Sequence, residues 1–183
     1  PMKTFFRFLV AVVFCTSAFA DGLLDFQIQG LKIGAKKEAV LKSHPAVKFS
    51  KSQTRGIDVG ILVDAKAIPP RIELRFLDGI LIEFQAIYSD AAVEKVGGPI
   101  ALVETLTKRL GAEPDIVIPP TGNEKEIKFG RGWSSLELSR AVILSSTTVP
   151  GRSSVIINVS DIDAQRKADE REENAKPRAD PGF

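Results

Sequence analysis

The sequence predicts an α+β fold in which two helices pack on one face of an antiparallel β-sheet. Two β-rich runs flank the turn signal Asp78-Gly79, which is typical of a hairpin. Further extended runs follow Pro114, and a helical segment precedes each group of strands. One face of the hairpin is apolar and must be buried, and we expect the helices to pack against it. The order of elements also matches a helix-then-strands unit used twice, the second starting near Ser89.

The chain has 183 residues, of which 44% are apolar and 26% charged, as in an ordinary soluble globular protein. We expect a single domain over residues 21–160, with 21–88 and 89–160 as the halves of the repeated unit. Residues 161–183 are charged and poor in apolar side chains, which predicts a solvated helix that frays into a partly disordered tail.

The first twenty residues are typical of a secretory signal peptide. Lys3 and Arg7 accompany an apolar run that ends in Ala18-Phe19-Ala20, a small-x-small cleavage site. Cleavage near Ala20 predicts a periplasmic or secreted protein. It removes Cys15 and two basic residues, so 25 minus 2 leaves 23 Lys and Arg against 23 Asp and Glu. A neutral chain is not expected to bind nucleic acid.

Several elements of the first half follow from local signals. Residues 23–34 suggest a short extended entry segment. Residues 36–43 predict a short helix that Pro45 stops, and residues 57–63 alternate as a strand does.

The register of the central hairpin can also be predicted. A loop of three residues, 77–79, places every apolar side chain of both strands on one face. This register pairs Phe76 with Ile80, Leu74 with Ile82 and Ile72 with Phe84. The other face should meet solvent and carry Glu73, Arg75, Leu81, Glu83 and Gln85.

The second half repeats the pattern of helix and strands. Ser89 or Asp90 can cap a first helical stretch, and a second helix begins at Pro99 and closes at Gly111. Its predicted apolar stripe is Ile100, Val103, Leu106 and Leu110. Strands are expected over 115–118, 125–133, 136–144 and 154–160, with loops at 119–123 and 145–154.

Some of these segments resemble those of a known group. Gly30-Leu31-Lys32-Ile33-Gly34, running into Lys37-Glu38-Ala39-Val40, is similar to the opening of BamE-like and β-lactamase-inhibitor-like domains of bacteria. The hairpin of residues 76–81 also looks similar. The resemblance implies a small secreted α+β domain that binds proteins or assists envelope assembly.

The sequence contains no recognisable catalytic constellation. His44 is the single histidine, and its position beside Pro45 indicates a capping or surface role. Glu73 and Glu83 are expected to be solvated, so that replacing both by alanine should leave any activity intact. We therefore predict no enzyme, no catalytic residue, no metal and no cofactor.

Two surfaces are candidates for binding. Trp133 is first interpreted as core packing, and alternatively as an anchor for a partner, with Arg131 and Arg140 beside it. The densest basic run is a solvated face or a contact for an anionic membrane surface or an acidic protein. This run contains Lys36, Lys37, Lys42 and Lys48.

The function expected from these observations is that of an exported, non-enzymatic binding or envelope-accessory protein. It would use an exposed sheet face or edge to bind a protein or a ligand. Two alternatives stay open: a hydrolase that uses carboxylates only, and a lipid-associated envelope factor.

Overall fold

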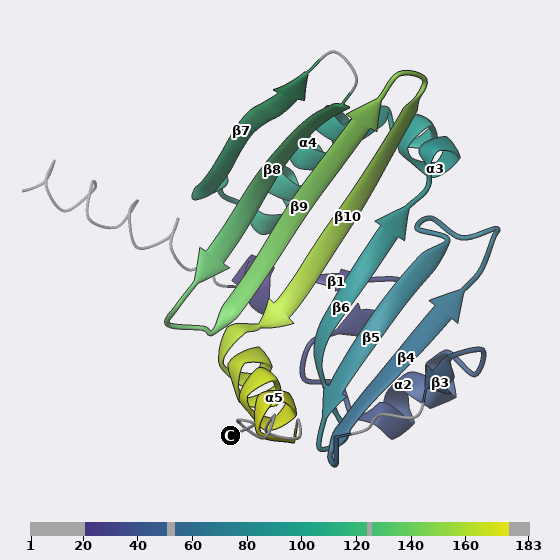
Figure 1. Ribbon diagram of the computed structural model, residues 1–183, viewed down its shortest axis with the longest axis vertical. Helices are drawn as coiled ribbons and strands as arrows, with labels where there is room; N and C mark the ends of the chain where they lie inside the picture. The colour runs from purple at the N-terminus through teal and green to yellow at the C-terminus, as the bar shows by residue number, and fades with distance from the viewer. Residues whose placement is uncertain (1–20, 51–53, 124–125, 176–183) are drawn as a thin grey trace, which may run out of the picture.

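The computed structural model of the chain describes residues 21–50, 54–123 and 126–175 (Figure 1). The predicted signal peptide and residues 176–183 lie outside the described residues. One eight-stranded antiparallel sheet forms the centre. From edge to edge its strands are β3 (Lys48–Ser50), β4 (Ile57–Val63), β5 (Arg71–Leu77), β6 (Ile80–Tyr88), β10 (Arg152–Asp161), β9 (Arg140–Val149), β8 (Glu126–Ser135) and β7 (Ile116–Asn123).

The strand order consists of two consecutive meanders, β3 to β6 and β7 to β10. They meet at the centre, where β6 and β10 pair antiparallel over residues 83–88 and 155–160. Each meander follows helical residues: α2 (Lys37–Ser43) precedes the first, while α3 (Asp90–Lys95) and α4 (Gly98–Leu110) precede the second. A small ribbon of β1 (Gln27–Ile28) and β2 (Leu31–Lys32) completes this layer.

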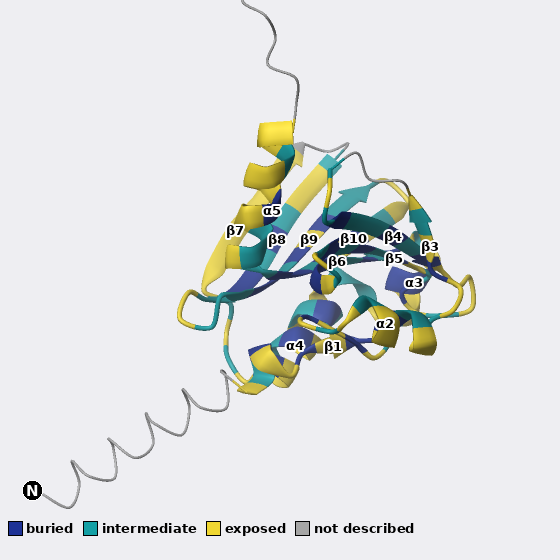
Figure 2. Ribbon diagram, turned by 90° about the horizontal axis from the view of Figure 1, so that it is seen from below, coloured by how far each residue is buried: buried dark blue, intermediate teal, exposed yellow. Residues whose placement is uncertain are grey.

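The helices do not share one face of the sheet. Figure 2 shows α2, α3, α4 and the β1–β2 ribbon on one side, which we call the inner face. The last helix, α5 (Ile162–Ala175), lies on the opposite side, the outer face. The predicted fold, two helices on one face of the sheet, is therefore wrong. The described chain has more strand than helix, and a segment predicted to be a solvated helix packs on the sheet.

The main core lies between the inner face and the helices that cover it. In α4 the buried residues are Leu102, Leu106 and Leu110, which recur every four positions and so face one way. Ile100 is 62% exposed, so the predicted stripe began on the wrong position of this helix. Gly111 ends α4 in a left-handed conformation, and its N–H donates to the Thr107 carbonyl.

The central hairpin uses a two-residue turn rather than the predicted three-residue loop. Asp78 and Gly79 have φ angles of 48° and 81°, the left-handed values of a type I′ turn. A bulge between the turn and Glu83 leaves Ile82 without a partner on β5. Because of the bulge, the residues of β6 between the turn and Glu83 lie on the opposite faces of the sheet from those predicted. Leu81 therefore lies in the main core, and Ile82 packs on the outer side with Ile57 and Ala168.

Two predicted loops of the second half are strand. β9 and β10 pair over ten residues each and turn at Pro150-Gly151, so residues 145–149 are not a loop. β7 continues through Pro119-Pro120 with an irregularity in its pairing. Prolines are tolerated there because β7 is an edge strand that needs donors on one side only.

Candidate binding site on the outer face of the sheet

An apolar patch occupies the outer face near the β7 edge. The register aligns Ile118, Gly130, Ser145, Ile156 and Ile87 across five strands. The neighbouring row runs through Ile116, Gly132 and Ile143. We define the apolar patch as Ile87, Ile116, Ile118, Ile143 and Ile156. Ile116, Ile118 and Ile156 are 37%, 48% and 38% exposed, which is unusual for three isoleucines that share one sheet face.

Two glycines of β8 flatten the patch. A Cβ atom at Gly130 would lie 3.0 Å from the Ile118 side chain, and one at Gly132 would lie 3.1 Å from that of Ile116. The isoleucines therefore lie over the β8 backbone instead of standing beside a side chain. A glycine inside a strand commonly marks such a close approach.

A polar cluster lies beside the patch, at the centre of the sheet. Its central group is the carboxylate of Glu83, which is only 6% exposed. Asn158 Nδ2 donates to Glu83 Oε1 at 2.7 Å, and Gln85 Nε2 donates to the same oxygen at 3.2 Å. The guanidinium of Arg75 lies 3.7 Å from Glu83 Oε2. The prediction that Glu83 is solvated is wrong, since β10 brings Asn158 over it.

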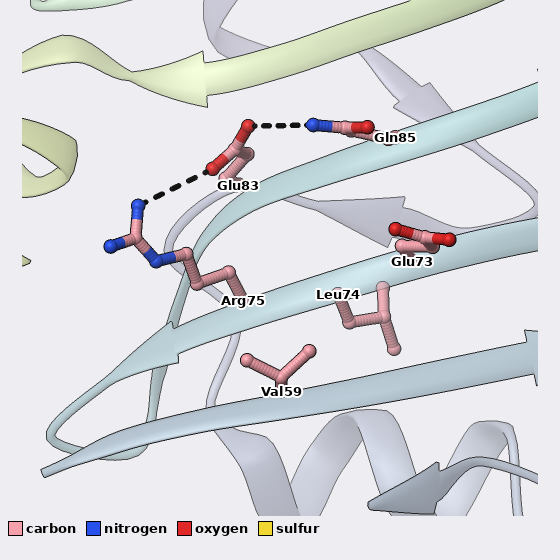
Figure 3. Close-up of a pocket in the computed structure, with 6 residues that line it drawn as sticks. All are labelled: Val59, Glu73, Leu74, Arg75, Glu83 and Gln85. Atoms are coloured by element: carbon pink, nitrogen blue, oxygen red, sulfur yellow. Dashed lines mark hydrogen bonds and ion pairs between the residues drawn. The ribbon is translucent and has the colours of Figure 1, made fainter. Parts of the chain in front are cut away.

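Glu83, Gln85 and Arg75 border a small hollow of about 120 Å³ (Figure 3). Val59, Glu73 and Leu74 complete its lining. Pockets for organic ligands usually measure roughly 300–1,000 Å³, so this hollow has room for about four water molecules and no more. Two carboxylates and an arginine do converge here. Glu83 Oε1 accepts two hydrogen bonds and Arg75 lies near Oε2, so the carboxylate is held by other groups of the protein.

Helix α5 covers the other end of the outer face and supplies anionic partners to Arg75. Asp169 and Glu172, one helical turn apart, lie 2.7 Å and 3.0 Å from the guanidinium. Burial by itself would lower the pKa of Arg75, but the hydrogen bond with Asp169 and the charges of Glu172 and Glu83 raise it. Arg75 is therefore a permanent cation beneath the helix.

The apolar contact of α5 is small. Ala168 is the one buried residue of this helix, and with Ala164 it packs on Ile57 and Ile82. Burying two methyl groups contributes roughly 1–2 kcal/mol. The carboxylates of Asp169 and Glu172 are 59% and 41% exposed. Ion pairs so exposed contribute at most about 1 kcal/mol each. The ion pairs of α5 and its apolar contact are therefore comparable in size, and both are small.

A third ion pair ties α5 to the hairpin turn. Arg171 Nη1 donates to Asp78 Oδ1 at 2.8 Å, and this hydrogen bond is the main cause that lowers the pKa of Asp78. Because the folded pKa is depressed, the stabilisation by this pair is present above the ordinary pKa of the carboxyl. It is lost as the pH falls through the lowered pKa.

An NMR titration of the Asp78 carboxyl carbon tests this docking. We expect a pKa below the ordinary value of 3.8 in the wild type and a return toward that value in Arg171→Gln. The control variant is Arg166→Gln, which removes a pair between Arg166 and Asp163 within α5 and should leave the Asp78 titration unchanged. Identical Asp78 titrations in the wild type and Arg171→Gln would mean that α5 is not docked in solution.

The structure gives each of the three residues that the sequence suggested for partner binding a partner within the chain. Trp133 is 0% exposed and its Nε1 donates to the Ala112 carbonyl at 2.8 Å, so it lies in the core, as the first interpretation had it. Arg131 donates to the carbonyls of Ile118 and Gly130 and helps fix the β7 edge.

Arg140 has a structural position at the start of α5. It forms an ion pair with Asp161, whose Oδ1 accepts a hydrogen bond from the Ala164 N–H and so caps the helix. The Ser139 hydroxyl accepts from the Asp163 N–H in the same turn. An exposed anchor for a partner therefore has to be sought elsewhere than at Trp133, Arg131 and Arg140.

The predicted basic run is only partly free. Lys37 forms an ion pair of 2.9 Å with Asp58 and lies 4.3 Å from the centre of the Phe49 ring. Lys36, Lys42 and Lys48 are at least partly exposed. No helix within residues 21–50, 54–123 and 126–175 has the length and apolar character to cross a membrane.

Sequence reasoning missed the two residues that organise the outer face. Glu83 and Asn158 are 75 positions apart, and no local pattern brings them together. His44 is the C-cap residue of α2, through a hydrogen bond from its backbone N–H to the Val40 carbonyl, which agrees with the predicted capping role. Across the described part of the chain, no three His, Cys, Asp or Glu side chains gather as a metal site requires.

Comparisons with known proteins give no family. No family model matches the chain, and no curated protein matches it. Among solved structures, an extracellular protein containing a SCP domain from Bacillus anthracis aligns with a TM-score of 0.35 and 11% identity. The alignment covers 77% of this chain and 46% of that one, so the chain spans less than half of its length. A likeness at this level supports neither a shared fold nor a shared function. The resemblance to BamE-like domains stays a prediction.

Proposed function

We propose that this protein is an exported, non-enzymatic binding protein whose outer sheet face recognises another protein. The observation that carries the proposal is the apolar patch, in which three exposed isoleucines from β7 and β10 lie on one flat surface. Export is proposed from the pattern of residues 1–20, with the periplasm as the compartment.

The size and shape of the outer face favour a protein over a small ligand. The hollow beside the patch, about 120 Å³, is below the range of ligand pockets, and a larger one of about 420 Å³ lies instead between the end of α5 and Asp78. Protein interfaces combine such an apolar centre with a rim of polar groups. Here Gln85, Glu73 and Arg71 would form part of that rim.

The expected result can be measured by capture from an envelope extract of the organism that encodes the chain. The tagged wild type should retain a protein that the double variant Ile118→Lys, Ile156→Lys loses, because two charges would be buried in the interface. The matched control is Ile100→Lys, since Ile100 is 62% exposed but lies on α4, over the inner face.

Three results would contradict the proposal. A protein captured equally by the wild type and the double variant would place the interface elsewhere. Loss of the same protein with Ile100→Lys alone would assign binding to the helical side. Capture of nothing above background by the wild type would also count against the proposal. Circular dichroism of each variant confirms that the fold is retained.

A further inference from the structure

We propose that the part of the outer face beneath α5 is a docking site for an acidic helix of the partner, and that α5 is its intramolecular occupant. The inference rests on the proposed function, since it names the chemistry that the partner presents to the same face. Figure 2 shows that α5 stands on the open side of the sheet, apart from the other helices.

The site beneath α5 combines the cation of Arg75 and the carboxylate of Asp78 with an apolar floor. Arg75 is only 16% exposed, and its anionic neighbours on the sheet reduce to Glu83 at 3.7 Å once α5 is removed. The floor consists of Ile57 and Ile82, exposed by 2% and 3% with α5 in place, and the half-buried Leu77. Ile82 reaches this floor because of the bulge in β6.

The floor lies on the same outer face as the apolar patch and continues along β4. Along β4, Ile57 lies under α5, while Val59, Ile61 and Val63 follow on the same face. Val63 is 60% exposed, and Val59 also lines the hollow beside the polar cluster. A partner that binds the open part of the outer face would therefore meet the edge of α5.

The occupant is an acidic helix because α5 itself displays what the site accepts. Arg75 receives two carboxylates spaced three residues apart on a helix, Asp169 and Glu172. The apolar side chains that α5 places on the floor, Ala168 and Ala164, are both small. A partner helix with the same two carboxylates and a larger apolar residue at the position of Ala168 would cover more of Ile57 and Ile82.

Helix α5 is held weakly enough for a partner helix to displace it from the sheet. A helix of 14 residues is marginal by itself in water, and only one of its residues is buried. Its start is fixed by the Asp161 cap, whereas its last two turns rest on exposed ion pairs. Segments of this kind open at the low end of a protein's range of local stability.

The test is binding of a labelled peptide with the sequence of residues 162–175 to the full mature chain. In the wild type the tethered α5 competes at an effective concentration near the millimolar range, so peptide binding should be weak. The variant Asp169→Asn, Glu172→Gln weakens the internal occupant and leaves the site intact. It should bind the peptide at least roughly tenfold more tightly than the wild type does, since each 1.4 kcal/mol of lost competition is a factor of about ten.

Three controls define the interaction. Glu170→Gln, Glu173→Gln changes the charge of α5 equally at two positions away from Arg75 and should bind like the wild type. Adding Arg75→Gln to the variant Asp169→Asn, Glu172→Gln should abolish the gain in peptide affinity. A peptide that itself carries the changes Asp169→Asn and Glu172→Gln should not bind, and binding of the native peptide should fall with salt.

Failure would appear as equal binding of both peptides, a gain that survives Arg75→Gln, or no gain at all. Glu172→Gln alone keeps the test available if the double variant loses its fold, and it should give an intermediate gain. If the peptide does not bind while Ile118→Lys, Ile156→Lys still loses the partner, only this inference fails. If the variant Ile118→Lys, Ile156→Lys still captures the partner, the proposed function fails, whether or not the peptide binds.

Discussion

Replacing Trp133 by alanine is expected to lower the free energy of unfolding by about 3–5 kcal/mol, the range for a large aromatic side chain removed from a core. Trp133 is 0% exposed within the main core, opposite Val142 on β9. Its loss opens a cavity and leaves the Ala112 carbonyl without the indole N–H that donates to it at 2.8 Å. Urea unfolding followed by circular dichroism measures the change.

Two companion variants separate packing from the hydrogen bond. Trp133→Phe keeps most of the volume and should cost about 1–3 kcal/mol, mainly for the unsatisfied carbonyl. Leu136→Ala is the surface control, because Leu136 is 85% exposed, and it should stay within about 0.5 kcal/mol of the wild type. A Trp133→Ala protein of unchanged stability that fails to capture the partner would show instead that the tryptophan is a surface anchor.

Replacing Glu83 by alanine is expected to lower the free energy of unfolding by about 2–4 kcal/mol. The same replacement at Glu73, its neighbour on the outer face, should be tolerated. The carboxylate is 6% exposed, and its removal leaves Arg75 and Asn158 facing an empty space. Arg75 keeps Asp169 and Glu172, so the cost comes mainly from the side-chain amides of Asn158 and Gln85, which lose their charged acceptor. Thermal and urea unfolding give the value.

The matched control is Glu73→Ala. Glu73 lies beside Glu83 on the outer face, but its side chain is 37% exposed and paired with Arg71 at 2.6 Å. Its replacement should change the stability by less than about 1 kcal/mol. Equal effects of the two substitutions would mean that Glu83 is solvated, as its alternating position in the sequence first suggested.

Local patterns identified most elements of the fold. The helix before Pro45, the strand Ile57–Val63 and the helix that ends at Gly111 follow from periods of 3.6 and 2.0 and from stop signals. The Asp78-Gly79 turn was also found. Its register was not, because a three-residue loop and a two-residue turn with a bulge place most of the same residues inward and differ at Ile80, Leu81 and Ile82.

The outer face could not be predicted, because contacts distant in the sequence build it. The charged residues of α5 look solvated until Arg75 and Asp78 are placed beneath them, and the Arg171–Asp78 pair spans 93 positions. A tryptophan in the core and a tryptophan in an interface look the same in a sequence. Only the position of Ala112 shows that the indole N–H of Trp133 is satisfied in the core. Charge and aromaticity in a sequence therefore do not reveal which face a side chain joins.

Site-specific photo-crosslinking in the native organism tests most directly whether the outer face is the binding surface. A photoreactive residue at position 156, in the apolar patch, should form an adduct with one partner protein. The same residue at position 100, which is also accessible but lies on α4 over the inner face, should not. An adduct at position 100 in the absence of one at position 156 would contradict the account.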